Sequence, residues 1–180
     1  NIKMEFSTMV SAFGEDAAKR IYAEGVAARE DLARFIEDEK IDCHFKMTGQ
    51  FTGAYRPKHY DRLAREAEFL NKNLDLGAEV VARANQHKEV DTELYYGGVV
   101  RPDIGGLHPG LFHQGILDRA LEAGVTVHGV TDVEGFVKDA EGFLITTSRG
   151  TTKARDLLVC TNGYTGKTTP WLQRRPRTAL

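Results

Sequence analysis

Three stretches of the chain carry apolar residues at the spacing of an amphipathic helix. In residues 15–40, 57–77 and 109–124, apolar positions recur at steps of three and four, so each helix would bury one face. Pro57 and Pro109 open the second and third stretches, where the amide hydrogen that proline lacks would have no partner. Gly77 and Gly124 mark the ends of these two helices.

Shorter runs of β-branched, aromatic and aliphatic residues predict strands. We expect them at residues 41–46, 49–55, 94–101, 125–128, 131–138, 143–148 and 157–160. Residues 139–142, Asp-Ala-Glu-Gly, join the fifth and sixth runs as a β-hairpin. Residues 6–10 form either a short strand or a loop.

The last of these runs, residues 157–160, is continuously apolar. Such a run is typical of a strand that a parallel sheet buries on both faces, so its final residue, Cys160, should be a buried thiol. Ligands in open α/β sheets lie just beyond the carboxyl ends of strands of this kind. The glycine turn that follows, residues 161–164, is therefore a candidate binding element.

Composition narrows the picture only slightly. The 180 residues fit one domain or one and a half, and 41% of them are apolar. A net charge of −2 creates no field that would draw nucleic acid to the chain, and we interpret the basic residues 174–177 as a solvated terminal segment rather than a nucleic-acid patch. No run is apolar and long enough for a membrane span. Two cysteines suit a reducing compartment, so we expect a cytoplasmic protein without nucleic-acid or membrane partners.

Two residues of the run at 94–101 are candidates for substrate binding. Tyr96, followed by two glycines that permit close approach, either lines a pocket or belongs to a bulged, packed strand. Arg101, at the end of the run, either holds a substrate carboxylate through a bidentate contact or forms an ion pair within the protein. His113 lies on the apolar side of the third helix, where we expect a buried, hydrogen-bonded core residue rather than a cofactor contact.

Several kinds of site are not indicated. No Gly-x-Gly occurs in the sequence, so the chain lacks the dinucleotide fingerprint and the phosphate loop. Cys43 and His44 have no second ligand pair at zinc spacing, so we predict no metal site. No catalytic residue can be assigned.

The order of the segments nevertheless resembles a known family. The stretch from Tyr95 to Pro109, the following helix, the hairpin, and the run from Ala154 to Leu172 with its Thr-Asn-Gly-Tyr-Thr-Gly and Pro-Trp-Leu are similar to the FAD-dependent amine and amino-acid oxidoreductases. This family includes D-amino-acid oxidase, glycine oxidase and sarcosine oxidase, and the similarity is greatest to its γ-glutamylputrescine oxidase-like branch. The family usually has an acidic residue where this chain has His108.

The resemblance implies a division of the chain. Residues 1–40 would be a long helix region, 41–104 a substrate-side antiparallel sheet with helices, 105–166 part of the FAD-binding domain with a crossover β-hairpin, and 167–180 a terminal segment. The fold class would be α+β, with an incomplete α/β cofactor domain. The sequence would be an internal portion of a longer protein, cut at both ends, since the family's glycine-rich segment lies before the matched part.

The resemblance also implies a function for the parent protein. It would oxidise the C–N bond of a small-molecule amine or amino acid to an imine, with FAD as the cofactor. Val133 would contact the adenine side of FAD through its main chain. The turn at Thr161, Asn162 and Gly163 would lie near the dinucleotide. The alternatives are a fragment of a nicotinamide-dependent dehydrogenase and a non-catalytic α+β module.

Three expectations follow for the 180-residue chain. Residues 94–101 should pair with residues 49–55 in one sheet, and the strands between residues 125 and 160 should form a second sheet. The chain alone should neither hold FAD tightly nor oxidise amines, because the element that binds the pyrophosphate is missing. Exposed apolar surface at residues 157–160 should favour a homodimer.

Overall fold

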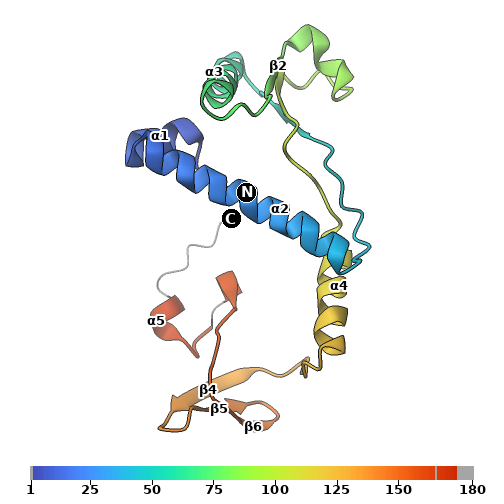
Figure 1. The fold of residues 1–180 in the computed structure, drawn as a ribbon. Helices are drawn as coiled ribbons and strands as arrows, with labels where there is room; N and C mark the ends of the chain where they lie inside the picture. Colours follow the sequence, from blue (N-terminus) through green and yellow to red (C-terminus); the bar gives the residue numbers. More distant parts are fainter. Residues whose placement is uncertain (1, 165, 174–180) are drawn as a thin grey trace. The chain divides into compact units, whose positions relative to one another are not determined.

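The computed structural model describes residues 2–164 and 166–173 (Figure 1). The chain forms two compact units, Asn1–Gly124 and Val125–Leu180, and each is described by itself. Both contain small antiparallel sheets, and the first adds long helices, so the expected α+β class is confirmed. None of the helices in the described ranges is long and apolar enough to cross a membrane. The basic residues 174–177 lie outside the described residues.

The described part of the first unit has four α-helices in addition to its sheet. They are α1 (Phe6–Phe13), α2 (Glu15–Asp38), α3 (Pro57–Leu74) and α4 (Pro109–Glu122). The three expected helices are therefore present, with both prolines at their first positions. His108 caps α4, because its Nδ1 accepts a hydrogen bond of 3.2 Å from the amide of Leu111.

The expectation of a strand or loop at residues 6–10 was wrong. Phe6 and Met9 are three residues apart, so both lie on one face of α1 and are buried. They pack with Ala18 of α2 and Leu70 of α3 in one core cluster. This shared burial outweighs the weak local signal for a strand. Gly14, at a φ of 83°, separates α1 from α2.

The sheet of the first unit has the strand order β1-β3-β2, all antiparallel. Its strands are β1 (Gln50–Gly53), β2 (Glu79–Val81) and β3 (Gly98–Arg101). The expected pairing of the two runs is confirmed, with Phe51 opposite Val100 and Gly53 opposite Gly98. Val99 packs with Ala67 of α3 and Ala78, so α3 covers one face of the sheet.

The strand β3 is shorter than the sequence predicted because the chain turns at Gly97. This residue has a φ of 87°, and a Cβ there would lie 2.4 Å from the carbonyl oxygen of Val81. The expected strand at residues 41–46 is reduced to a bridge between Lys46 and Gly106. Ile41 and Cys43 are nevertheless buried, together with Ile36 of α2.

His113 was wrongly predicted to be buried. It is exposed, and the structure shows no hydrogen bond from its ring to any of the described residues. Phe112 packs on the Ile36–Cys43 cluster, and a Cβ on Gly115 would lie 2.3 Å from the side chain of Ile41. One residue turns a helix by about 100°, which carries His113 out of the face that Phe112 and Gly115 share.

The second unit is built on a three-stranded meander. Its strands are β4 (Val133–Lys138), β5 (Phe143–Thr147) and β6 (Gly150–Ala154), paired antiparallel in that order. The hairpin between β4 and β5 and the second sheet are confirmed. Asp139 holds the turn, because its Oδ1 accepts hydrogen bonds from the amides of Glu141 and Gly142 at 2.8 and 3.0 Å. The strand β6 was not predicted, since Gly-Thr-Thr-Lys-Ala lacks an apolar face.

Two other expected strands, residues 125–128 and 157–160, are not formed. Both runs are mostly exposed, with Leu158 84% exposed, and Cys160 is an exposed thiol rather than a buried one. A strand needs a neighbour for its amide and carbonyl groups. Within the described residues, no strand pairs with either run. The turn after residue 160 becomes a short 3₁₀ helix, Asn162–Tyr164, and α5 (Pro170–Gln173) follows.

Candidate functional site

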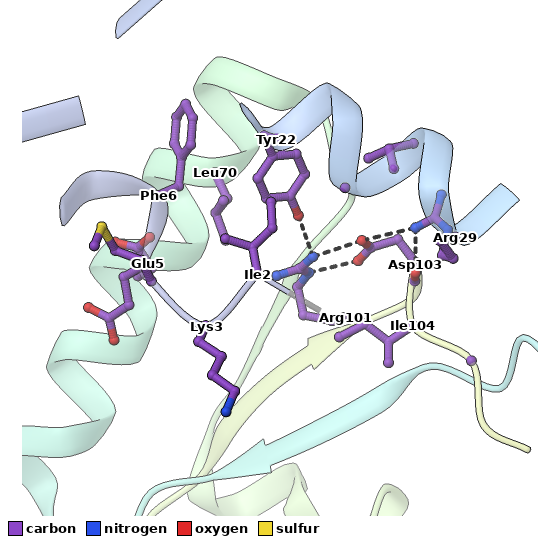
Figure 2. A pocket seen from close by; sticks show the side chains of 15 residues that line it. Ile2, Lys3, Glu5, Phe6, Tyr22, Arg29, Leu70, Arg101, Asp103 and Ile104 are labelled. Carbon is purple, nitrogen blue, oxygen red and sulfur yellow. Dashed lines mark hydrogen bonds and ion pairs between the residues drawn. The ribbon is translucent and has the colours of Figure 1, made fainter. Parts of the chain in front are cut away.

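The first unit contains a cavity of about 370 Å³ (Figure 2). Four parts of the chain line it: the residues that precede and begin α1, the middle of α2, α3, and the end of β3 with the segment that follows. The lining combines apolar side chains with six charged ones. The charged residues are Lys3, Glu5, Arg29, Glu66, Arg101 and Asp103.

A network of hydrogen bonds centred on Arg101 forms one wall of this cavity. Its Nε and Nη2 donate to the two carboxylate oxygens of Asp103, each at 2.7 Å. Nη2 also donates to the hydroxyl of Tyr22 at 2.6 Å. Arg29 donates from Nη1 to the main-chain oxygen of Asp103 at 2.6 Å, and its Nη1 lies 3.4 Å from Oδ2. Two guanidinium groups therefore share one carboxylate.

The network shifts the pKa values of three of its members. Burial raises the pKa of the Tyr22 hydroxyl, although the charge of Arg101 opposes this. The hydrogen bonds to Asp103 raise the pKa of Arg101. At Asp103, burial opposes ionisation, but the hydrogen bonds and charge of Arg101 outweigh it and hold the pKa of the carboxyl below its ordinary value. The Arg101–Asp103 pair is thus ionised at neutral pH.

The structure shows an internal partner for Arg101, one of the two residues predicted to bind substrate. The bidentate geometry expected for a substrate carboxylate is present, but the carboxylate belongs to Asp103. A role of Arg101 in substrate binding stays a prediction. Sequence reasoning missed Tyr22, Arg29 and Asp103. The signal for Asp103 was its charge, opposite to that of Arg101 and two residues away, whereas nothing in the sequence links these two residues to α2.

Tyr96, the other predicted substrate residue, lies elsewhere in the first unit. It precedes β3, whereas Arg101 ends it, so the length of this strand separates the two. The guanidinium carbon of Arg83 lies 4.7 Å from the centre of the Tyr96 ring, and the ring is 39% exposed. Tyr96 does not line the cavity at Arg101.

Gln86 fixes the segment that carries Tyr96. Its side chain is fully buried in the 3₁₀ helix η1 (Arg83–Lys88). Its Nε2 donates to the carbonyl of Thr92 at 2.8 Å, and its Oε1 accepts from the amide of Gly97 at 3.0 Å. Sequence reasoning gave no reason to single out this glutamine, because it lies in a polar stretch that looks solvated.

The four residues expected near the cofactor all lie in the second unit. Val133 begins β4 next to a bulge, is 45% exposed, and accepts a hydrogen bond of 2.8 Å from the Thr168 hydroxyl at its main-chain oxygen. Thr161 precedes the 3₁₀ helix that contains Asn162 and Gly163, and Asn162 adopts a left-handed conformation with a φ of 48°. The structure does not test their assignment to cofactor binding.

Comparisons of the sequence with a family model and with a known protein both point to oxidoreductases. The family model described as FAD dependent oxidoreductase (DAO) matches residues 6–178. A probable oxidoreductase, OrdL, from Haemophilus influenzae is 21% identical over 156 residues, which cover 86% of this chain and 36% of that protein.

Solved structures show the same fold. Glycine oxidase from Geobacillus kaustophilus has a TM-score of 0.71 at 18% identity, and the match covers 83% of this chain and 41% of that one. Glycine oxidase from Bacillus cereus has a TM-score of 0.70 at 15% identity, with coverage of 84% and 43%. L-proline dehydrogenase from P. horikoshii has a TM-score of 0.60 at 19% identity, with coverage of 82% and 39%.

The chain spans about two fifths of the length of these relatives. The two compact units meet at Gly124, so α4 belongs to the first unit. The expected division into a substrate-side part and a cofactor domain stays a prediction. The family match covers both units and almost every described residue. The chain therefore belongs to the DAO family of FAD dependent oxidoreductases.

Proposed function

We propose that the parent protein of this chain oxidises the C–N bond of an amine or amino acid to an imine. The family match over residues 6–178 carries this proposal, because the members of the family are FAD dependent oxidoreductases. The names of two structural relatives, glycine oxidase and L-proline dehydrogenase, indicate amino acids as their substrates. The match favours a flavin over the nicotinamide-dependent alternative and over a module without a cofactor.

The proposed chemistry divides between cofactor and protein. FAD, when bound, accepts a hydride equivalent from the carbon next to the nitrogen, and water then hydrolyses the resulting imine. The protein must present the amine in its neutral form and exclude water from the reacting atoms. In this proposal the first unit supplies part of the substrate side, through the sheet β1-β3-β2 and its helices.

The residues of this chain fit only one end of FAD. Val133, which is 45% exposed, and the turn at Thr161, Asn162 and Gly163 are suited to the adenine and ribose, as the resemblance to the family suggests. The pyrophosphate requires amide donors from a glycine-rich turn at a helix N-terminus. The sequence contains no Gly-x-Gly to form such a turn.

This partial fit leads to an experiment with two proteins. FAD is titrated into the 180-residue chain and into the longer parent, and flavin fluorescence reports binding. We expect stoichiometric binding by the parent and weak or no binding by the chain. A parent that binds no FAD would remove the flavoenzyme proposal. Tight binding by the chain would leave that proposal standing and show that the cofactor site has been misplaced.

A further inference from the structure

We propose that the cavity at Arg101 binds a small organic carboxylate. In this arrangement the carboxylate meets the outer edge of the Arg101 guanidinium, and its carbon chain lies against the apolar lining. The inference uses only residues of the first unit and does not depend on the proposed oxidation. It can therefore fail or hold independently of that function.

The charges on one wall of the cavity, formed by Arg29, Arg101 and Asp103, favour an anion. Of the acidic lining residues, Glu5 is paired with Arg62, and Glu66 accepts hydrogen bonds from the amide and hydroxyl of Ser7. The third acid, Asp103, is shared by two guanidinium groups, so this wall carries one uncompensated positive charge. Arg29 also lies 3.7 Å from Glu30, but that carboxylate is 56% exposed and its effect is screened by solvent.

One donor group of the network remains available. Arg101 uses Nε and Nη2 for Asp103 and Tyr22, and among the described residues nothing accepts a hydrogen bond from its Nη1. In Figure 2 this third nitrogen points away from Asp103, on the side of Ile2. The Arg101 side chain is only 21% exposed, so a ligand at Nη1 would be poorly screened by water. Asp103 holds the guanidinium in place and prepares this edge for a ligand.

The remaining lining selects the class of anion. Ile2, Phe6, Val26, Leu70 and Ile104 give the cavity an apolar surface. Its volume of about 370 Å³ lies at the lower end of the range of small-molecule pockets, which is roughly 300 to 1,000 Å³. A phosphate dianion needs several donors and little apolar surface. A carboxylate on a short aliphatic body needs one charged edge and apolar walls, which this cavity has.

The binding experiment uses butyrate as the probe. It is titrated into the 180-residue chain at constant ionic strength, and NMR chemical shifts of the Arg101 Nε–H and of the Tyr22, Val26 and Ile104 amides are followed. Butyramide and butylamine have the same carbon chain without the negative charge, and inorganic phosphate has the charge without the chain. We expect saturable shifts with butyrate, and affinities at least about tenfold weaker for the three other compounds.

Three variants locate the site. Arg101→Gln should weaken butyrate binding about tenfold or more, because a hydrogen bond to a charged group is lost. Val26→Phe fills the cavity, keeps every charge, and should abolish binding, so it decides the matter if Arg101→Gln does not fold. Arg34→Gln removes a cation from the exposed Arg34–Asp31 pair on α2, the helix that also carries Val26. This control variant should bind butyrate normally. Equal binding of butyramide, tighter binding of phosphate, or unchanged binding by Val26→Phe would each overturn the proposal.

Discussion

Arg101 and Asp103 are joined by two parallel hydrogen bonds of 2.7 Å across the single residue Pro102. The pair also connects the end of β3 to α2. Tyr22 and Arg29 lie on one face of α2 and bind the same two residues. Nη2 of Arg101 donates to the Tyr22 hydroxyl, and Nη1 of Arg29 donates to the main-chain oxygen of Asp103, each at 2.6 Å. The end of the sheet is thus attached to α2, the longest helix among the described residues, and one wall of the cavity is fixed in the same way.

The Asp103 carboxylate should make the stability of the first unit depend on acid. Its pKa is lowered in the folded protein, so its contribution is present above the unfolded pKa of about 3.9 and is lost as the pH falls through the folded value. Asp103→Asn should therefore lower the free energy of unfolding by about 2 kcal/mol at pH 7. Below about pH 4 the difference from the unmodified chain should shrink.

Urea titrations at neutral and acidic pH measure this difference. Asp31→Asn, which removes the exposed partner of Arg34, is the matched control and should change stability by less than about 0.5 kcal/mol. A difference between Asp103→Asn and the unmodified chain that stays constant with pH would show that the carboxylate charge is not responsible.

Gly97 should not tolerate a side chain. Its φ of 87° is strained for other residues, and a Cβ would lie 2.4 Å from the Val81 oxygen. We expect Gly97→Ala to destabilise the first unit by roughly 1 to 3 kcal/mol in urea unfolding. Gly135→Ala, where nothing lies within 4 Å, is the control and should be close to neutral. Equal effects of the two substitutions would contradict the close approach of β2 to this turn.

Gln86 should control the order of the segment that carries Tyr96. Gln86→Leu removes the acceptor for the Gly97 amide and the donor to Thr92, and leaves both buried groups without partners. We expect a loss of about 2 kcal/mol and faster hydrogen exchange at the Gly97 amide. Gln114→Leu, on the exposed side of α4, provides the comparison. If the Gly97 amide exchanges at an unchanged rate in Gln86→Leu, the proposed role of the glutamine fails.

The exposed run at residues 157–160 should promote self-association of the 180-residue chain. Leu158 is 84% exposed and has Val159 beside it, so a dimer would remove apolar surface from water. Light scattering during gel filtration should show dimers whose fraction falls in Leu158→Lys. Val130→Lys alters an even more exposed residue outside this run and should leave the dimers intact. A monomer at all concentrations would refute the expectation.

Local patterns predicted the helices but not the burial of each one, since α4 has no buried residue and its Ile116 and Leu121 are exposed. α2, α3 and α4 follow from apolar steps of three and four, and the pairing of β1 with β3 followed from the family resemblance. The pattern failed where burial depends on distant partners. His113 lies among apolar neighbours in sequence, but the small surface that α4 presents to Ile41 centres on Phe112 and Gly115.

The candidate site was predictable only in part, for the same reason. Arg101 was singled out as a carboxylate-binding residue, and the structure places a carboxylate on it. The cavity is assembled from four segments of the chain. Tyr22 and Arg29 of α2, which bind Arg101 and Asp103, are more than 70 positions away from them in sequence. No local pattern in a single sequence encodes such contacts. Residues 157–160 show the opposite failure. Their apolar run predicted a strand, but no strand among the described residues pairs with them.

Anaerobic reduction of the flavin tests the central claim most directly. The longer parent protein with bound FAD is mixed, without oxygen, with a panel of amines and amino acids and with alcohols of the same carbon skeletons. We predict that at least one amine bleaches the visible absorbance of the oxidised flavin and yields the carbonyl compound expected from imine hydrolysis, whereas the matched alcohol does neither. Reduction by the alcohol alone, or a flavin that no amine reduces, would contradict C–N oxidation.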